Sequence, residues 1–181
     1  MFESQKILPA ISSHQDLRKF LKTSMPYGIL MNFQLAQLPS LIEAMQHADK
    51  KILIHLDMIK GLSSDEYGAI YLIQHFKVDG VITTKPRVID LCKKRGVIGI
   101  MRFFLKDSIS LSQSLEILKR SAPDAVEVLP AKHSEIIDTI RGHTSAEILM
   151  GGLIETKEEI RSCLAAGAAA VTTSNFELWS E

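Results

Sequence analysis

Near its C-terminus the chain reads Met150-Gly151-Gly152-Leu153-Ile154, then a helical pattern, and then Ala168-Ala169-Ala170-Val171-Thr172-Thr173-Ser174-Asn175. Each stretch joins an apolar run to a loop of glycines or hydroxyl residues, so we interpret the pair as consecutive parallel strands with their loops. In (β/α)₈ barrels, the loops after strands 7 and 8 commonly form a phosphate site. The two stretches therefore predict a barrel of this type.

The same two loops predict which residues contact the phosphate. Glycine carries no Cβ, so a glycine pair lets the backbone approach an anion closely. Hydroxyl groups after the second strand, with the free N–H groups of a short following helix, can bind the same anion. We therefore expect the phosphate to be held by Gly151, Gly152, Thr173 and Ser174. The alternative is that the glycine pair only ends a strand and the later hydroxyl residues form an ordinary helix N-cap, without a phosphate site.

Short apolar runs alternate with amphipathic stretches along the whole chain, as a parallel sheet covered by helices requires. The candidate strands are residues 7–11, 28–32, 51–57, 80–84, 97–103, 125–129, 147–151 and 169–173. They favour a single domain over residues 1–181, a compact α/β barrel of the (β/α)₈ TIM type. Its units average about 22 residues, against about 30 in a typical barrel, so its loops are short. A doubly wound open sheet is the alternative, but no Gly-x-Gly-x-x-Gly follows the first strand.

Composition excludes several classes of protein. The 181 residues include 21 Lys and Arg and 21 Asp and Glu, so net charge attracts neither nucleic acid nor an anionic membrane. No apolar run is long enough to span a membrane, and the N-terminus lacks the pattern of a signal peptide. Cys92 and Cys163 fall in helical patterns, so we expect buried free thiols, which suit a reducing cytoplasm. No metal-ligand cluster and no Ser-His-Asp arrangement stands out.

Polar residues end several apolar strands and would meet at the barrel mouth, where ligands bind. Burying such groups without partners costs about 1–3 kcal/mol each, so they are expected to face partners or a ligand. The guanidinium of Arg102 is expected either to bind a phosphate or carboxylate through two parallel hydrogen bonds, or to form a salt bridge with Glu127 or Asp57. The candidates for a polyol and charge network are Asp57, Lys60, Arg102 and Glu127. His55 lies two residues before Asp57 and would share its strand face.

An enzyme is one function that these residues leave open. Lys60 would suit Schiff-base chemistry if it were desolvated beside a proton-transfer group, and Glu127 or Asp57 would serve as a general base. Such an enzyme would be an isomerase, aldolase or epimerase acting on a small sugar phosphate. The short loops weigh against it, because little chain is available to close over a substrate. We expect the loop over residues 58–64 to move. Ser64, the last residue of this loop, is expected to be the N-cap of the next helix.

An ordered set of motifs resembles one known family over nearly the whole chain. The motifs are Ile7-Leu8-Pro9-Ala10-Ile11, His55-Leu56-Asp57-Met58-Ile59-Lys60-Gly61-Leu62, Arg102-Phe103-Phe104-Leu105-Lys106-Asp107-Ser108, Val126-Glu127-Val128-Leu129-Pro130, Gly151-Gly152-Leu153-Ile154, and Val171-Thr172-Thr173-Ser174-Asn175 with Leu178-Trp179. Together they resemble the glycerol uptake operon antiterminator regulatory proteins. The resemblance implies a cytoplasmic, non-enzymatic barrel without a cofactor, whose effector is glycerol 3-phosphate. With the effector bound, it would act on the leader mRNA of glycerol-utilisation genes, so that transcription passes a terminator.

The resemblance also implies where the effector would lie. Its phosphate would occupy the glycine and hydroxyl loops described above. The groups that would address the glycerol hydroxyls or balance the charge are Asp57, Glu127 and Arg102, with Lys60 and Lys85 at the rim. Three positions depart from the family pattern: Ser12 in place of a basic residue, Asn32 in place of Asp, and Glu155 in place of Arg. The first and third departures make the mouth less positive.

RNA recognition is implied by the resemblance alone. The chain has no aromatic motif for base stacking and no basic tail. The candidate contacts to RNA phosphates are Lys85, Arg87, Lys106 and Lys132. The run Lys93-Lys94-Arg95 ends a helical pattern, where the helix dipole already favours cations. Scattered cations predict weak RNA binding that falls as salt rises. The sequence leaves the oligomeric state open, a homo-oligomer included.

Overall fold

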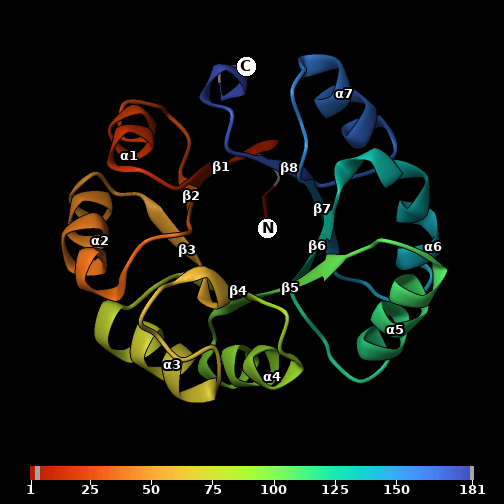
Figure 1. Cartoon of the computed structure of the whole chain (residues 1–181), viewed down its shortest axis with the longest axis horizontal. Helices are drawn as coiled ribbons and strands as arrows, with labels where there is room; N and C mark the ends of the chain where they lie inside the picture. The colour runs from red at the N-terminus through yellow and green to blue at the C-terminus, as the bar shows by residue number, and fades with distance from the viewer. Residues whose placement is uncertain (3–4, 180–181) are drawn as a thin grey trace.

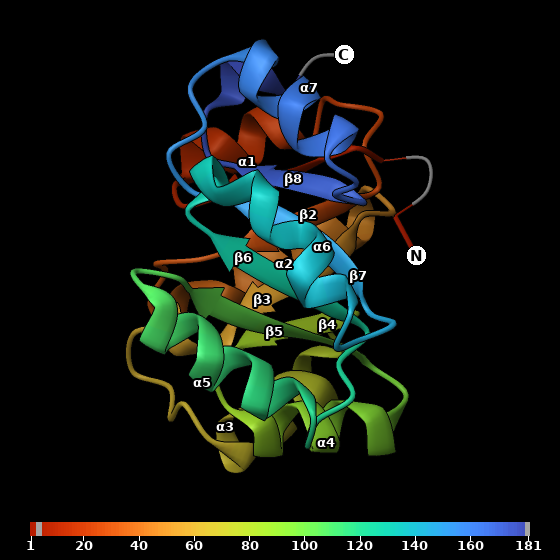
Figure 2. The same cartoon turned by 90° about the vertical axis from the view of Figure 1, so that its right-hand side faces the viewer.

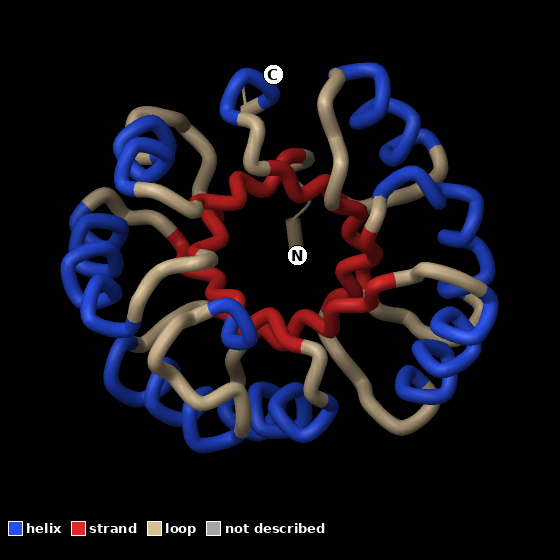
Figure 3. Tube along the Cα trace, in the orientation of Figure 1, coloured by secondary structure: helices blue, strands red, loops and turns tan. Residues whose placement is uncertain are grey.

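Eight parallel strands close into a barrel in the order in which they occur along the chain (Figures 1 and 3). The computed structural model describes residues 1–2 and 5–179, with residues 133 and 134 described by their backbone alone. The strands are β1 (Ile7–Ile11), β2 (Tyr27–Leu30), β3 (Lys51–His55), β4 (Gly80–Thr83), β5 (Ile98–Phe104), β6 (Ala125–Leu129), β7 (Glu147–Gly151) and β8 (Ala170–Thr173). The predicted (β/α)₈ barrel is confirmed.

Short helices cover the outside of the barrel (Figure 2). Those of α type are α1 (His14–Phe20), α2 (Leu38–His47), α3 (Glu66–Tyr71), α4 (Pro86–Arg95), α5 (Ser108–Leu118), α6 (Ile137–Arg141) and α7 (Lys157–Ala165). Shorter turns of 3₁₀ or π type are η1 (Leu35–Gln37), η2 (Leu56–Met58), η3 (Leu72–Phe76), η4 (Ala131–Ile136) and η5 (Phe176–Leu178). The turn η5 follows β8, and in Figure 1 it stands between α1 and α7.

Two predicted strands end two residues earlier than the sequence suggested, and both differences lie at the barrel mouth. The strand predicted over residues 28–32 begins at Tyr27 and ends at Leu30, because Asn32 adopts a left-handed φ of 63°. The strand predicted over residues 51–57 ends at His55, because the next three residues form η2. Asp57 therefore leaves the sheet, and the prediction that it shares a strand face with His55 is wrong.

The helix after η2 starts one residue later than expected. Asp65, not Ser64, is its N-cap, and the Asp65 carboxylate accepts hydrogen bonds from the backbone N–H groups of Tyr67 and Gly68, both at 3.0 Å. A carboxylate accepts more strongly than a hydroxyl and also complements the positive end of the helix. Ser64 is thereby released to donate from its hydroxyl to Asp57.

The inside of the barrel is filled by one apolar layer with a side chain from every strand. These side chains are Leu8, Ile29, Leu53, Ile82, Ile100, Ala125, Leu149 and Ala170. Phe2 joins the same cluster and packs edge-on against Tyr27, with ring centroids 5.1 Å apart. Gly80 makes room for this packing, since a Cβ there would lie 2.6 Å from a methyl group of Leu53. The layer closes the barrel below its mouth, so a ligand can enter only above it.

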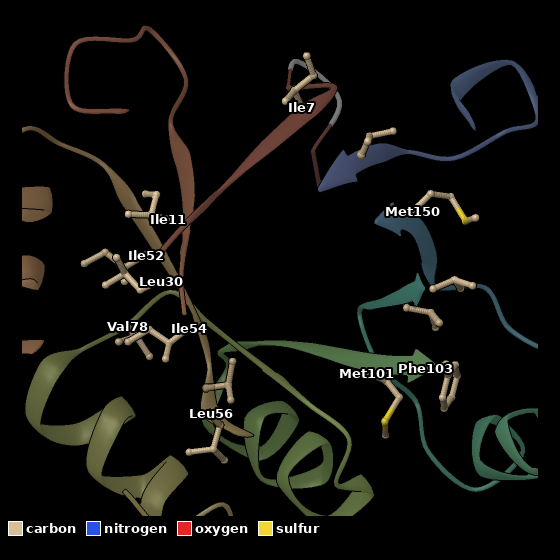
Figure 4. Packing of buried hydrophobic residues seen from close by; sticks show 14 of the residues in the cluster. Ile7, Ile11, Leu30, Ile52, Ile54, Leu56, Val78, Met101, Phe103 and Met150 are labelled. Atoms are coloured by element: carbon tan, nitrogen blue, oxygen red, sulfur yellow. The ribbon is translucent and has the colours of Figure 1, made fainter. Parts of the chain in front are cut away.

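A second and larger apolar layer lies between the strands and the helices. In Figure 4, Ile11, Leu30, Ile52 and Ile54 lie together on the helix side of their strands. Cys92 and Cys163 are buried in this layer as free thiols, as predicted. Burial raises the pKa of Cys92 to about 12, with a further contribution from the negative charge of Asp124. Among the residues that the structure describes, no helix is long and apolar enough to cross a membrane.

Candidate functional site

A polar layer lies directly above the apolar layer, on the mouth side of the barrel. Side chains two residues apart on a strand point to the same face, so each inner apolar residue predicts the next inward residue. The step leads from Leu8 to Ala10, from Leu53 to His55, from Ile100 to Arg102, from Ala125 to Glu127, from Leu149 to Gly151, and from Ala170 to Thr172. Strand alternation thus concentrates a histidine, an arginine, a glutamate and a threonine at one level.

This layer forms the floor of a pocket of about 360 Å³. The pocket is lined by Ala10, Met31, His55, Met58, Arg102, Glu127, Leu129, Gly152, Leu153, Ile154, Glu155, Thr172, Thr173 and Ser174. Its walls come from loops after β2, β3, β7 and β8, and its floor from the strands themselves. Apolar walls with a few converging polar groups are typical of a small-molecule site.

Glu127 is the centre of the polar layer. Its side chain is 2% exposed, and its Oε1 accepts a hydrogen bond of 2.7 Å from the Thr172 hydroxyl. Its other oxygen, Oε2, lies 3.6 Å from His55 Nε2, beyond hydrogen-bond distance, and has no hydrogen-bond partner. A buried carboxylate oxygen without a donor is costly, so Oε2 is prepared to accept a hydrogen bond from a ligand.

His55 is held neutral beside this carboxylate. Burial lowers the pKa of the imidazole and outweighs the opposite effect of Glu127, while the positive charge of Arg102 lowers the pKa further. The Nδ1 atom of His55 is buried without a hydrogen-bond partner. The ring of His55 is therefore neutral at neutral pH, and both His55 and Glu127 have an unused polar atom.

Arg102 adds a positive charge to the same pocket. Its Nη1 contacts the sulfur of Met58 at 3.3 Å, and its Nε is buried without a hydrogen-bond partner. The alternative salt bridge with Glu127 or Asp57 is not formed in the described part of the chain. Both carboxylates are engaged elsewhere, Glu127 by Thr172 and Asp57 by the loop after β4. The guanidinium therefore remains available to an anion.

The predicted phosphate loops lie on one side of this pocket. Gly152, Thr173 and Ser174 line it, and Gly152 has a φ of 78° that favours glycine. The hydroxyl of Thr173 accepts from the backbone N–H of Asn175 at 3.1 Å. The short helix expected after β8 is the three-residue turn η5, and the side chain of Asn175 already accepts from its Glu177 N–H. This side of the pocket therefore presents hydroxyl groups and loop residues, not the free N–H groups of a helix.

Gly151 lies beneath the pocket rather than on its wall. It ends β7, and a Cβ at this position would lie 2.0 Å from the Thr172 hydroxyl and 3.4 Å from Glu127 Oε1. The missing side chain therefore makes room for the hydrogen bond between Thr172 and Glu127. A phosphate contact by Gly151 stays a prediction from the sequence.

Asp57 joins two loops and does not line the pocket. Its carboxylate accepts from the Thr83 hydroxyl at 2.9 Å and from the Thr84 backbone N–H at 2.7 Å, besides the Ser64 hydroxyl. Burial by itself would raise the pKa of Asp57, but these hydrogen bonds together outweigh it and hold the pKa below its usual value. Asp57 thus ties the loop after β3 to the loop after β4.

Lys60 also lies away from the mouth pocket. It is exposed, it pairs through its backbone with Gln34, and it lines a separate open depression with Leu35 and Gly61. The four predicted RNA contacts are exposed and lie on loops or helix starts after β4, β5 and β6: Lys85, Arg87, Lys106 and Lys132. The structure therefore brings Arg102 and Glu127 together and separates them from Asp57 and Lys60.

Nine residues of the pocket were not among the predicted site residues, and Met31, His55, Met58 and Thr172 are four of them. Strand alternation directs His55 and Thr172 to the mouth, since each lies two residues after an inner apolar residue. The methionines lie in loops, where no periodicity places a side chain. Across residues 1–2 and 5–179, no group of three or more His, Cys, Asp or Glu side chains could hold a metal ion.

Comparison with known proteins identifies the family of this chain. Residues 7–179 match the model of the family described as "Glycerol-3-phosphate responsive antiterminator". The chain belongs to this family. The glycerol uptake operon antiterminator regulatory protein from Listeria monocytogenes str. 4b F2365 is 33% identical in sequence to this chain. Its crystal structure superposes on this one with a TM-score of 0.94. The match covers 98% of this chain and 96% of the Listeria chain.

Two further proteins resemble this antiterminator-family chain over almost its whole length. A glycerol uptake operon antiterminator-related protein from Thermotoga maritima MSB8 is 26% identical, with a TM-score of 0.81 and 96% of each chain covered. The uncharacterized protein YgcP from Escherichia coli (strain K12) is 23% identical over 99% of this chain and 94% of its own length. The chain thus belongs to a family of antiterminator regulatory proteins.

Proposed function

We propose that this protein is a transcription antitermination regulator that senses glycerol 3-phosphate in the mouth of its barrel. The observation that carries the proposal is the polar layer around Glu127. Three buried polar atoms of this layer, His55 Nδ1, Arg102 Nε and Glu127 Oε2, have no hydrogen-bond partner. Buried polar atoms in folded proteins almost always have a hydrogen-bond partner, so these three are expected to be completed by a ligand or by ordered water.

The effector has two chemically distinct ends, and the pocket has two matching sides. The glycerol hydroxyls can donate to Glu127 Oε2, which is deep in the pocket and lacks a donor. The phosphate would lie toward Gly152, Thr173 and Ser174, which line the pocket together. Arg102 would compensate its charge, because a guanidinium binds phosphate through parallel hydrogen bonds. Apolar walls from Leu129 and Ile154 would exclude water from the carbon chain.

Regulation follows if the effector binds the RNA-competent state of the protein more tightly than the other state. By linkage, leader mRNA must then tighten effector binding by the same factor. We propose that the protein acts in the cytoplasm, where the leader mRNA of glycerol-utilisation genes is transcribed. Its family membership supports this role, and no catalytic step or cofactor is part of it.

Isothermal titration calorimetry of the purified protein with glycerol 3-phosphate tests the effector. Free glycerol and inorganic phosphate serve as controls, since each carries only one end of the ligand. We expect saturable binding of glycerol 3-phosphate and at least about tenfold weaker binding of either part, because each loses hydrogen bonds to charged groups. Equal binding of inorganic phosphate would contradict recognition of the glycerol end by Glu127.

A leader RNA assay tests the output. In transcription with purified polymerase from a template that carries a glycerol-gene leader and its terminator, read-through should rise when protein and effector are both present. Read-through that ignores the effector would contradict the proposed sensing step.

The second candidate is a sugar-phosphate isomerase, aldolase or epimerase, and the pair of His55 and Glu127 favours it. A neutral imidazole 3.6 Å from a carboxylate, both buried at a barrel mouth, is a chemically competent proton-transfer pair. Recovery of the ligand after prolonged incubation separates the two functions. Because these reactions need a carbonyl group, a triose phosphate is the probe: its recovery intact supports the sensor, whereas its conversion, lost in Glu127→Gln, supports the enzyme.

A further inference from the structure

A groove on the flank of the barrel, between α1 and η5, is larger than the mouth pocket. It encloses about 520 Å³, and it lies where the short turn η5 occupies the gap between α1 and α7 (Figure 1). The lining combines two lysines, two hydroxyl groups and two aromatic rings: Lys6, Lys19, Thr23, Ser24, Phe176 and Trp179. These are the side-chain types that contact phosphates, sugars and bases of nucleic acids.

The floor and one wall of this groove are held rigidly. Gln5 is buried and clamps the start of β2, since its Nε2 donates to the carbonyl of Tyr27 and its Oε1 accepts from the Tyr27 N–H, both at 2.8 Å. The Nζ of Lys50 donates to the carbonyls of Thr23 and Met25 at 2.6 and 2.9 Å. These contacts hold the loop before β2, which forms one wall of the groove.

The charge of the groove is positive in an otherwise neutral protein. Lys6 and Lys19 line it, and the end of α1 adds the exposed cations Arg18 and Lys22 beside it. In the described part of the chain, no carboxylate side chain is among the groove-lining residues. Glu177, the acidic residue of η5, lies outside the lining. The groove is thus complementary to a polyanion.

The aromatic residue Phe176 gives the groove a stacking surface. The ammonium of Lys19 lies 2.9 Å from the centroid of its ring, so a cation and an aromatic ring are already placed together. Phe176 nevertheless remains 45% exposed, so part of its ring is accessible to a base. A base stacked on Phe176 would bring its flanking phosphates close to a lysine.

We infer that this groove binds a single-stranded segment of RNA, with phosphates at Lys6 and Lys19 and a base on Phe176. The inference rests on the proposed function, since it assigns a surface to the RNA that the regulator must contact. The lysines predicted from the sequence fit this role less well, because they lie on separate loops and Lys106 is followed by Asp107 at its helix N-cap.

The groove is joined directly to the effector site by the chain itself. Thr173 and Ser174 line the mouth pocket, and the next residue, Asn175, caps η5. The indole N–H of Trp179, which lines the groove, donates back to the carbonyl of Thr173 at 2.9 Å. A ligand that fixes Thr173 and Ser174 therefore also fixes the position of η5, and this contact links the two sites energetically.

Fluorescence anisotropy with labelled oligouridylate and oligoadenylate, each with and without glycerol 3-phosphate, tests the inference. The double variant Lys6→Glu/Lys19→Glu should weaken binding of both probes at least about tenfold and lower the salt slope by about 1.4, as loss of two phosphate contacts predicts. Its matched control is Lys93→Glu/Lys94→Glu, which makes the same charge change on α4 and should bind as the native protein does. Phe176→Leu should weaken binding by roughly tenfold through lost stacking.

Photo-crosslinking with a 4-thiouridine RNA, followed by peptide mapping, gives a readout that is independent of affinity. Crosslinks should fall on the peptides that contain Lys19, Phe176 and Trp179. Crosslinks confined to the peptides of Lys85, Lys106 or Lys132, or equal affinity in both double variants, would overturn the groove as the RNA site and leave the regulator proposal intact. A dimer that the groove variant dissociates, seen by light scattering, would assign the groove to a second copy instead. Absence of any RNA binding by the native protein would overturn both.

Discussion

Glu127 accepts a hydrogen bond of 2.7 Å from the hydroxyl of Thr172, although the two residues are 45 positions apart in the chain. They lie on β6 and β8, on either side of β7, where Gly151 pairs with Thr172 and a Cβ on Gly151 would lie 2.0 Å from the Thr172 hydroxyl and 3.4 Å from Glu127 Oε1. A glycine in the middle strand lets two inward side chains on either side of it reach one another. This contact fixes one oxygen of Glu127 and leaves the other to the ligand.

Gly151→Ala should break this contact. The new Cβ would lie 2.0 Å from the Thr172 hydroxyl, so Thr172 must rotate away and Glu127 loses its buried donor. We expect a loss of about 1–3 kcal/mol in the free energy of unfolding, measured by urea titration, and weaker binding of glycerol 3-phosphate. Gly142→Ala is the matched control, because its Cβ would be 3.4 Å from the nearest atom. Equal stability of the two variants would contradict this account of Gly151.

Glu127→Gln should lower the affinity for glycerol 3-phosphate while the barrel remains folded. The amide keeps an oxygen for Thr172 but removes the negative charge that would accept from the glycerol hydroxyls. Loss of a hydrogen bond to a charged group costs about 1.5–3 kcal/mol, or about tenfold to a hundredfold in Kd by calorimetry. Glu155→Gln is the control on the same pocket, where the side chain is exposed. Unchanged affinity in Glu127→Gln would remove Glu127 from the effector site.

His55 should make the protein less stable in mild acid. Its pKa in the folded state is lowered from 6.5, chiefly by burial, so the unfolded chain binds the proton more readily. Stability is therefore complete above about pH 6.5 and falls as the pH drops below that value toward the folded pKa. The melting temperature of the native protein should decrease over this range, and that of His55→Gln should decrease less. Parallel melting curves against pH would show that His55 is not the group responsible.

Cys92 and Cys163 should resist thiol reagents in the folded protein. Both are buried, and burial raises the pKa of each thiol, that of Cys92 to about 12. The reactive thiolate is therefore scarce as well as inaccessible. With Ellman's reagent, we expect no rapid reaction in buffer and two equivalents per chain in guanidinium chloride. Fast modification of one thiol in buffer would indicate local opening of α4 or α7.

The barrel could be predicted from the sequence because near-continuous apolar runs indicate parallel strands that are buried on both faces. The deep half of the site was predictable for a related reason. Arg102 and Glu127 interrupt apolar strands, and strand alternation fixes where such side chains point. Their partners were harder to predict, because register between strands decides which inward residues meet. The contact of Glu127 with Thr172 depends on that register.

Loop residues were placed less well, since no periodicity governs them. Asp57 was assigned to the mouth as though its strand continued, but the chain turns at residues 56–58 and directs the carboxylate to Ser64 and Thr83. Lys60 was assigned to the rim, but its backbone pairs with Gln34, and both residues line a separate depression away from the mouth pocket. The groove at η5 has no sequence motif at all, because its residues come from the two ends of the chain.

Asp57→Asn separates a structural role of Asp57 from a role in ligand binding. The carboxylate accepts three hydrogen bonds that join the loops after β3 and β4, and an amide can accept at only one of its two positions. We expect a loss of about 1–3 kcal/mol in unfolding free energy, with the Kd for glycerol 3-phosphate changed less than in Glu127→Gln. Asp65→Asn is a comparison in the same loop, where an N-cap amide is nearly as good as a carboxylate. If Asp57→Asn abolished effector binding without loss of stability, Asp57 would have to reach the ligand after all, and the loop over residues 58–64 would have to move to permit it.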